Sequence, residues 1–134
     1  MIVVDTNVLA YLYLPGKHSA AAEALLLRDS EWAVPRLWRS EFRNVLATYM
    51  RGGLLSYDDA VRIHRTAESL MAGGEYDVGG VEVLRLAKDS GCSAYDCEFI
   101  ALAIKLEAKL VTMDKKLLKA FPKRTVALNA GQSG

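Results

Sequence analysis

Four acidic residues that are distant from one another in the sequence lie within or beside apolar segments, where a charge is costly to bury. Asp5 and Asp114 each end a short apolar run of strand type, whereas Glu41 and Asp96 lie on or beside the apolar side of helical segments. Carboxylates that meet within about 4 Å repel one another by ~4 kcal/mol at an effective dielectric near 20. If these four converge, they stay ionised only around a cation, and oxygen ligands favour Mg²⁺ or Mn²⁺ over zinc. Such a site can activate water beside a phosphate.

Asp96 lies near the middle of the apolar arc of the segment 94–108, at about 100° of rotation per residue. A charge in that position costs several kcal/mol unless something compensates it. The alternative is a capping box with Ser93, although capping-box carboxylates usually lie near solvent. Glu98 falls on the opposite side of the segment, with Lys105, and we interpret it as an exposed structural residue.

Glu41 repeats this pattern in the segment 36–51, where it lies at the inner edge of an apolar stripe. Its alternative interpretation is an edge charge that pairs with a neighbouring arginine. Asp5 also has a structural alternative, because the residues Asp, Thr and Asn at 5–7 all favour turns and helix caps. The metal-site hypothesis therefore depends on all four acids sharing one place in the fold.

The elements that must position these acids can be predicted from the apolar pattern. Strand-type runs occur at 2–5, 32–34, 76–78, 110–113 and 125–128, and helical patterns at 18–29, 36–51, 56–71, 80–89, 94–108 and 115–120. This alternation predicts an α/β fold, a three-layer α/β/α sandwich with a short central parallel sheet. Reactive groups in such sheets gather beyond the carboxyl ends of the strands, where Asp5 and Asp114 are expected.

The 134 residues suffice for one domain, which we expect at 1–130, with a disordered tail at 131–134. The net charge of +1 excludes binding of nucleic acid through bulk charge and requires a local basic patch instead. Two cysteines are too few for a disulfide framework, so we expect reduced core thiols. No basic leader and no apolar stretch of ~18 residues is visible, which predicts a cytoplasmic protein without a membrane span.

The sequence is similar to PIN-domain ribonucleases, most closely to VapC-type toxins of bacterial and archaeal toxin–antitoxin pairs. The motifs that carry this resemblance are VVDTNVL at 3–9, RSEFRNVL at 39–46, SAYDCEFIALA at 93–103 and LVTMDKKL at 110–117. They cover nearly the whole chain in the family's order. The one departure is YDC in place of the commoner YDA, which exchanges one small residue for another.

The resemblance implies a function and a set of site residues. Its acidic quartet maps onto Asp5, Glu41, Asp96 and Asp114, and its supporting polar residues map onto Thr6, Asn7 and Thr112. The implied activity is Mg²⁺- or Mn²⁺-dependent endonucleolytic cleavage of RNA. A metal-activated water would attack the phosphorus in line and leave a 5′-phosphate and a 3′-hydroxyl.

The resemblance also implies partners. A VapC-type toxin forms homodimers or dimer-based hetero-oligomers, and a small cognate antitoxin protein inhibits it. The apolar N-terminal helices at 9–16 and 23–27 could supply a groove for the antitoxin or could equally be core. RNA would be held by local cations, for which the candidates are Arg39, Arg43, Lys115 and Lys116. We interpret the aromatic residues Tyr11, Tyr13, Trp32 and Trp38 as core or interface rather than as platforms for bases.

Two other functions compete with a ribonuclease toxin. The first is a PIN-like RNA-binding or scaffold module whose metal site is unused, which the loss of an acid would favour. The second is a phosphotransfer domain, such as a receiver or a haloacid-dehalogenase-like phosphatase. Such a phosphatase places a second aspartate two residues after the first, where this chain has Asn7, and the acidic pair and lysine of a receiver are not in the expected order.

Overall fold

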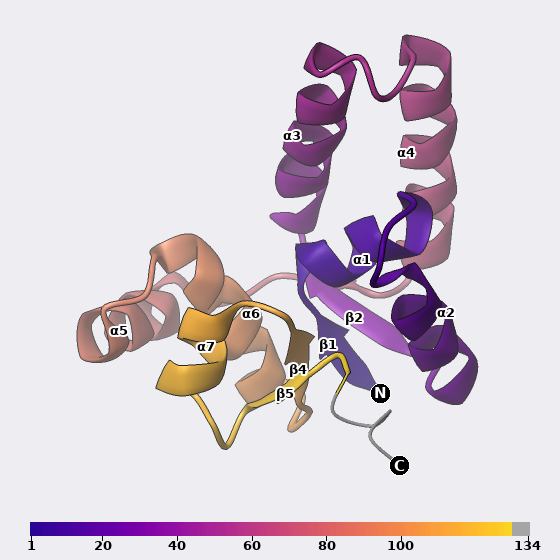
Figure 1. The fold of residues 1–134 in the computed structure, drawn as a ribbon. Helices are drawn as coiled ribbons and strands as arrows, with labels where there is room; N and C mark the ends of the chain where they lie inside the picture. The colour runs from indigo at the N-terminus through magenta and orange to yellow at the C-terminus, as the bar shows by residue number, and fades with distance from the viewer. Residues whose placement is uncertain (130–134) are drawn as a thin grey trace.

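Five strands and seven helices occupy residues 1–129, the part of the chain that the computed structural model describes (Figure 1). The strands are β1 (Ile2–Val4), β2 (Trp32–Pro35), β3 (Glu75–Tyr76), β4 (Leu110–Thr112) and β5 (Thr125–Ala127). The helices are α1 (Thr6–Tyr13), α2 (Ser19–Arg28), α3 (Trp38–Arg51), α4 (Tyr57–Met71), α5 (Gly80–Ser90), α6 (Ala94–Lys105) and α7 (Lys115–Ala120). The tail predicted at 131–134 lies outside the described residues.

All five strands run parallel in the order β3-β2-β1-β4-β5, so β1 is central. Val3 of β1 lies opposite Ala33 of β2 on one side and Leu110 of β4 on the other. The chain moves outward from β1 to β3 and then returns across the sheet to β4. The strand order therefore reverses between β1 and β4, and such a reversal opens a crevice at the carboxyl ends. Asp5 and Asp114 follow these two strands.

Helices α1 to α4 cover one face of the sheet and α5 to α7 cover the other, as right-handed connections require (Figure 1). This arrangement confirms the predicted three-layer α/β/α sandwich. Helix α6 packs on β1, β2 and β4, and α1 contacts β4 from the opposite face. The α3–α4 hairpin extends beyond the sheet (Figure 1). Within the described residues, none of the helices combines the length and the apolar character needed to cross a membrane.

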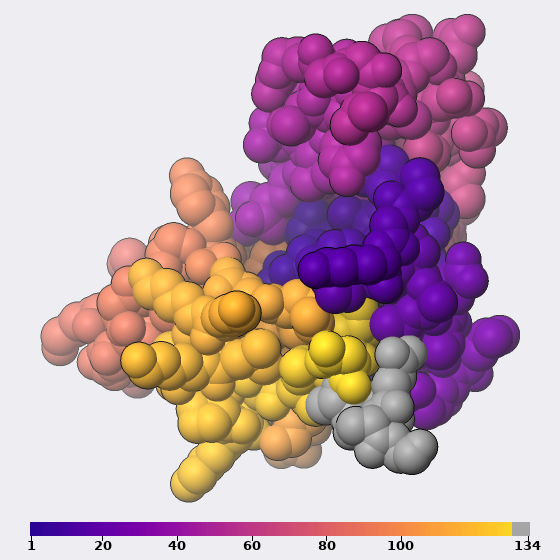
Figure 2. Space-filling model, in the orientation of Figure 1, coloured from indigo at the N-terminus to yellow at the C-terminus, as the bar shows by residue number. Residues whose placement is uncertain are grey.

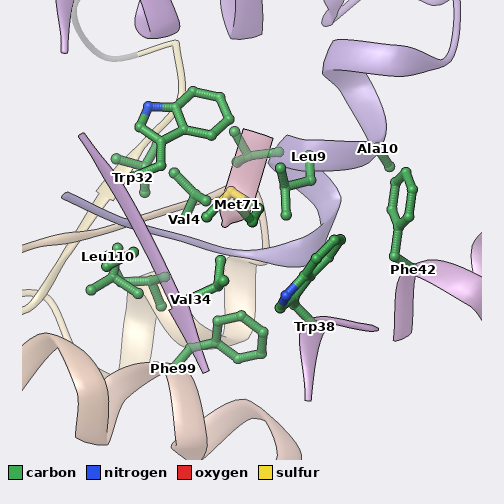
Figure 3. Close-up of a cluster of buried hydrophobic side chains, with 14 of the residues drawn as sticks. Val4, Leu9, Ala10, Trp32, Val34, Trp38, Phe42, Met71, Phe99 and Leu110 are labelled. Atoms are coloured by element: carbon green, nitrogen blue, oxygen red, sulfur yellow. The ribbon is translucent and has the colours of Figure 1, made fainter. Parts of the chain in front are cut away.

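The core forms on both faces of the sheet, because the strands are short and almost wholly apolar. Figure 3 shows the strand side chains of Val4, Val34 and Leu110 between Leu9 of α1 and Phe99 of α6. All five of these side chains are at most 1% exposed. Cys92 and Cys97 are free and buried, as predicted. The two strands that carry the candidate acids are therefore held rigidly by packing from both sides.

The first helix begins earlier than the apolar pattern suggested. A helix was expected around 9–16, but α1 starts at Thr6, because the side chain of Asp5 accepts the backbone N–H of Thr6 at 2.8 Å and caps the helix. The expected range also ran too far, since Leu14 is already in extended conformation as the C-cap. The strand thus turns directly into a helix at the acid that ends it.

Two other boundaries differ from the prediction. The helix predicted at 94–108 ends at Lys105, because Glu107 has a φ of 53° and the chain reverses there. The strand predicted at 76–78 lies at Glu75–Tyr76 instead, where it pairs with the end of β2. Neither shift moves an acid of the predicted quartet.

Candidate active site at the carboxyl ends of β1 and β4

Asp5 is held in place through both of its carboxylate oxygens. Its Oδ1 accepts the backbone N–H of Thr6 at 2.8 Å, and its Oδ2 accepts the hydroxyl of Thr112 at 2.7 Å. The residue is 8% exposed, and this burial raises the pKa of Asp5 from 3.8 to about 6, although both hydrogen bonds oppose the rise. A carboxylate that is buried and incompletely compensated favours the approach of a cation.

Thr112, which is fully buried, connects the ends of the two strands. Its hydroxyl donates to Asp5 and accepts the backbone N–H of Asp114 at 3.0 Å. Asp114 in turn caps α7, because its Oδ1 accepts the backbone N–H groups of Lys116 at 2.8 Å and Leu117 at 3.3 Å. One carboxylate oxygen of Asp114 therefore has a structural role, in addition to the predicted role at a metal.

Glu41 reaches the same place from α3. Its Oε1 accepts the hydroxyl of Thr6 at 2.8 Å, which connects α3 to the first residue of α1. Burial raises the pKa of Glu41, the bond from Thr6 lowers it, and the charges of Asp5 and Asp96 raise it again. Among residues 1–129, no ion pair involves Glu41, so the alternative of an arginine partner is wrong.

Asp96 approaches from the opposite face, on the first turn of α6. The Ser93 hydroxyl caps this helix by accepting the backbone N–H of Asp96 at 3.1 Å. The carboxyl group is half-buried, and burial and the charge of Asp114 raise its pKa, whereas Lys116 lowers it. Asp96 thus has the predicted cap and also a charged environment that the cap does not explain.

The structure brings the four acids to one place. The members of this acidic quartet are Asp5, Glu41, Asp96 and Asp114. The negative charges of Asp96 and Asp114 raise the pKa of Asp5, and Asp114 raises that of Asp96, so the groups lie close enough to repel one another. Figure 2 shows the indigo N-terminal segment, which contains Asp5, lying between the magenta α3–α4 hairpin and the orange C-terminal part. Four segments that are distant in sequence therefore converge on the strand-order reversal.

The four carboxylates do not surround a common point at which one ion would contact three of them. Within residues 1–129, no three side chains of His, Cys, Asp or Glu stand where they could hold one metal ion without moving. The amide oxygen Oδ1 of Asn7 is buried and, among the described residues, has no hydrogen-bond partner. A buried oxygen of this kind calls for a cation or a water molecule. The available donors are all oxygen atoms, which fits a hard divalent cation such as Mg²⁺ or Mn²⁺.

Glu98 is placed differently from the prediction. The helical pattern assigned it to the exposed side of α6, but its side chain is half-buried, so that assignment is wrong. Burial raises the pKa of Glu98, and its charge contributes to the raised pKa of Glu41. The helical angle failed here because it leaves out the neighbouring elements, among them α3, whose Glu41 lies close enough for the charge of Glu98 to raise its pKa. Glu98 therefore borders the quartet.

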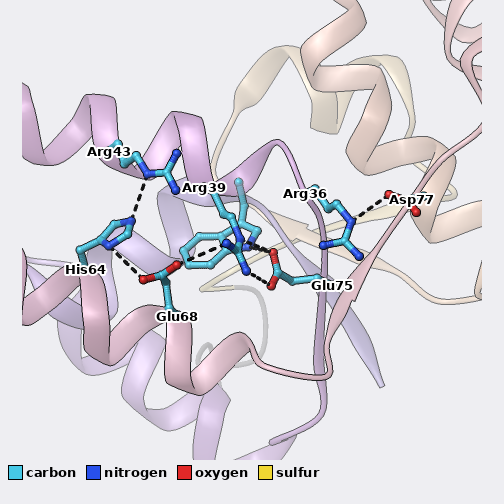
Figure 4. A network of polar contacts seen from close by, with 8 residues as sticks. Arg36, Arg39, Arg43, His64, Glu68, Glu75 and Asp77 are labelled. Carbon is cyan, nitrogen blue, oxygen red and sulfur yellow. Dashed lines mark hydrogen bonds and ion pairs between the residues drawn. The ribbon is translucent and has the colours of Figure 1, made fainter.

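The predicted cations of α3 are engaged within the protein (Figure 4). Arg39 forms a two-point ion pair with Glu75, at 2.7 Å for each N–O contact, and a longer one of 3.4 Å with Glu68 of α4. Arg43 donates from Nε to Nε2 of His64 at 3.2 Å. These contacts fasten α3 to α4 and to β3. The structure therefore gives Arg39 and Arg43 a structural role that the sequence pattern did not indicate.

The predicted cations of α7 lie nearer the acids. Lys115 and Lys116 are exposed in the first turn of α7, directly after Asp114. The ammonium of Lys116 donates to the carbonyl oxygen of Gly91 at 3.1 Å, and its positive charge lowers the pKa of Asp96. Lys116 therefore lies beside the quartet, with Lys115 next to it in sequence, whereas the arginines of α3 contact α4 and β3.

A parallel α/β/α sandwich with carboxylates at the strand-order reversal places the chain among doubly wound α/β proteins with an acidic site, and comparison with known proteins gives the family. The family model described as PIN domain matches residues 2–122, so the chain belongs to the PIN-domain family. Ribonuclease VapC3 from Pyrobaculum aerophilum is 31% identical over an alignment 134 positions long, which covers 90% of this chain and 95% of that protein.

Two solved structures show how widely the fold is shared. PAE2754 from Pyrobaculum aerophilum has a TM-score of 0.77 at 24% identity, with 96% of this chain and 83% of that chain covered. A structure described as a toxin-antitoxin complex from Klebsiella pneumoniae has a TM-score of 0.68 at 16% identity, with 96% and 98% covered. At these identities the likeness establishes the fold of this chain.

Proposed function

We propose that the chain is an endoribonuclease that depends on Mg²⁺ or Mn²⁺ and is the toxin of a toxin–antitoxin pair. The observation that carries this proposal is the convergence of the acidic quartet on the strand-order reversal, where its members raise one another's pKa. Uncompensated carboxylates cost stability, and a fold keeps them when they bind a cation. The 31% identical relative is named a ribonuclease, which supports RNA as the substrate.

The quartet would hold the ion, and other residues would set its geometry. Thr112 and Thr6 fix the orientation of Asp5, and Thr6 also fixes Glu41. Asn7 would turn its unpaired oxygen toward the ion or toward a water molecule beside it. Asp114 would contribute the carboxylate oxygen that does not cap α7. A bound divalent ion supplies charge for a phosphate oxygen and lowers the pKa of water, which is the chemistry that phosphodiester hydrolysis requires.

RNA would meet the quartet from the side of α7. Lys115 and Lys116 are the exposed cations closest to Asp114 in the sequence, and they suit a backbone phosphate. Arg39 and Arg43 would contribute only if RNA displaced their partners in the α3–α4 hairpin. We therefore rank the lysines above the arginines as RNA-binding residues.

The protein would act with partners in the cytoplasm. A small antitoxin is proposed because a structural neighbour is described as part of a toxin-antitoxin complex. A homodimer would cover the exposed apolar side chains of Val81 and Leu84 on α5, each 67% exposed. A single nuclease domain spanning 1–130 fits the one sheet that joins all five strands.

Cleavage of RNA tests the proposal. Purified protein should cut a structured RNA with Mn²⁺ or Mg²⁺, and excess EDTA should stop the reaction. Asp96→Asn should lower the rate by at least a hundredfold while the melting temperature in EDTA does not fall. Asp89→Asn makes the same chemical change on an exposed part of α5 and should cut like the wild type. Equal cleavage by wild type and Asp96→Asn would assign the activity to a contaminant.

The same experiment separates the alternative function. A PIN-like RNA-binding module with an unused metal site would bind the RNA without cutting it in any divalent metal. The separation of the carboxylates within the described residues is the observation that favours this alternative. Binding without turnover in Mg²⁺, Mn²⁺ and Co²⁺ would establish it.

A further inference from the structure

A small hollow lies beside the C-terminal end of α1. Its cavity volume is about 230 Å³. Three parts of the chain line it, namely the end of α1, the loop from α1 to α2 and the second half of α3. Its ring-bearing side chains are Tyr11, His18 and Tyr49, and the exposed cation Lys17 stands in the loop at its edge. Hollows of the hydrophobic core do not carry this combination of rings and charge.

The rings in this hollow are available to a ligand. The ring centroids of Tyr11 and His18 are 4.7 Å apart, with planes inclined by 46°, and both residues are only half-buried. His18 stands at the N-cap of α2 but makes no capping hydrogen bond through its side chain. The imidazole is therefore not committed to the helix. Partly exposed aromatic rings with polar atoms are the groups that stack on unpaired bases and read their edges.

The hollow is close to the acidic quartet. Tyr11 lies six residues after Asp5, which is about 9 Å along α1, and side chains of a helix lean toward its N-terminus. The charge of Asp5 accordingly contributes to the raised pKa of Tyr11, after burial, and so does Tyr49. Stacked nucleotides advance ~3.4 Å each along a strand. A base in the hollow would therefore lie within about three nucleotides of a phosphate at Asp5.

We propose that this hollow, called here the Tyr11 pocket, receives one unpaired base of the RNA substrate, stacked against Tyr11 and His18 with a neighbouring phosphate near Lys17. The assignment rests on the proposed ribonuclease function and adds a role to Tyr11, which also packs against the core as predicted. It predicts that the enzyme cuts at a fixed number of nucleotides from a base that is not paired. Loss of such a stacking contact weakens binding of a single strand by roughly 5- to 150-fold.

Binding of a defined RNA tests the pocket. The probe is a 5′-fluorescein-labelled, 12-nucleotide single-stranded RNA of mixed sequence, measured by anisotropy with Asp96→Asn as the non-cutting background. In that background, Tyr11→Leu should weaken binding at least fivefold, whereas Tyr11→Phe keeps the ring and should stay within twofold. Tyr57→Leu, at an exposed tyrosine of α4, is the matched control and should bind like the background protein. His18→Leu gives a second variant should Tyr11→Leu fail to fold.

Photo-crosslinking gives a readout that does not depend on activity. The same RNA carries one 4-thiouridine at each position in turn, and crosslinked peptides are identified by mass spectrometry. We expect one position to crosslink to the peptide that contains Tyr11 or His18, and an abasic nucleotide at that position should weaken binding like Tyr11→Leu.

The outcomes separate the pocket from the proposed function. Cutting by the wild type with unchanged binding in Tyr11→Leu, and crosslinks only elsewhere, would overturn the pocket and leave the ribonuclease intact. Protection of Tyr11 and His18 by a co-expressed antitoxin but not by RNA would assign the hollow to a protein partner and also overturn it. If the wild type neither binds nor cuts any RNA, both proposals fail.

Discussion

Replacement of Asp5 by asparagine should stabilise the metal-free protein at neutral and alkaline pH. Burial raises the pKa of Asp5 from 3.8 to about 6, a shift of about two pH units. Each unit corresponds to 1.36 kcal/mol, so the folded state loses about 3 kcal/mol when Asp5 must ionise. The pKa of Asp5 is higher in the folded state than in the unfolded state. The protein therefore has its full stability below pH 3.8 and loses these ~3 kcal/mol as the pH rises through about 6.

Asparagine keeps the shape of Asp5 but carries no charge. Its amide can accept only one of the two hydrogen bonds that Thr6 and Thr112 donate to the carboxylate, which costs about 1 kcal/mol. At pH 8 we therefore expect the free energy of unfolding of Asp5→Asn to exceed that of the wild type by about 2 kcal/mol. At pH 4 the wild-type carboxyl is largely protonated, so the order should be equal or reversed.

Urea unfolding in EDTA, at several pH values from 4 to 8, measures this difference. The control is Asp89→Asn, which removes one negative charge at an exposed position. Addition of Mn²⁺ at a hundred times its dissociation constant should stabilise the wild type by ~2.7 kcal/mol at pH 8 and should leave Asp5→Asn nearly unchanged. Parallel pH profiles for wild type and Asp5→Asn would refute the reasoning, because they would mean that ionisation of Asp5 costs the fold nothing.

Three further changes test the scaffold around the quartet. Thr112→Val removes the hydroxyl that donates to Asp5, so the pKa of Asp5 rises further and the acid limb of the cleavage pH–rate profile moves to higher pH. Glu75→Gln removes the negative charge of the two-point ion pair with Arg39 and should lower the urea midpoint slightly, with cleavage per folded molecule unchanged. Gly74→Ala drives a Cβ atom into the backbone carbonyl oxygen of Trp32, so the unfolding free energy should fall by ~3 kcal/mol, and an unchanged melting temperature would contradict that contact.

The fold could be predicted because its signals are local and repeated. The three central strands are short and mostly apolar, and buried parallel strands need no alternation, so Ile2–Val4 and Leu110–Thr112 stand out in the sequence. Glycines and serines mark several helix ends, such as Gly91, which closes α5 with a φ of 74°. The convergence of Asp5 and Asp114 then follows from the parallel direction of the strands that carry them.

The surroundings of the quartet could not be predicted, because they depend on which helices face one another. A helical wheel treats α6 as an isolated cylinder and assigns Glu98 to water, but the residue is half-buried and lies near Glu41 of α3, which is distant in sequence. The same holds for Arg39, which the sequence predicts as an RNA-binding cation but which pairs with Glu75 of β3 in the structure. Charged residues in sequence give no indication of their partners when those partners lie on other elements.

The hydrogen bonds at the site would compete with a bound cation for the carboxylate oxygens. Thr6 and Thr112 donate one hydrogen bond to each oxygen of Asp5, and Thr6 also donates to one oxygen of Glu41, so the orientation of both carboxylates is fixed. A bound ion would have to share or displace these bonds, and it would also remove the repulsion that raises the pKa of Asp5 and Asp96. Binding of the ion should therefore be coupled both to a small movement of the quartet and to the release of protons below pH 7. An affinity for Mn²⁺ that weakens as the pH falls through about 6 is the measurable consequence of that coupling.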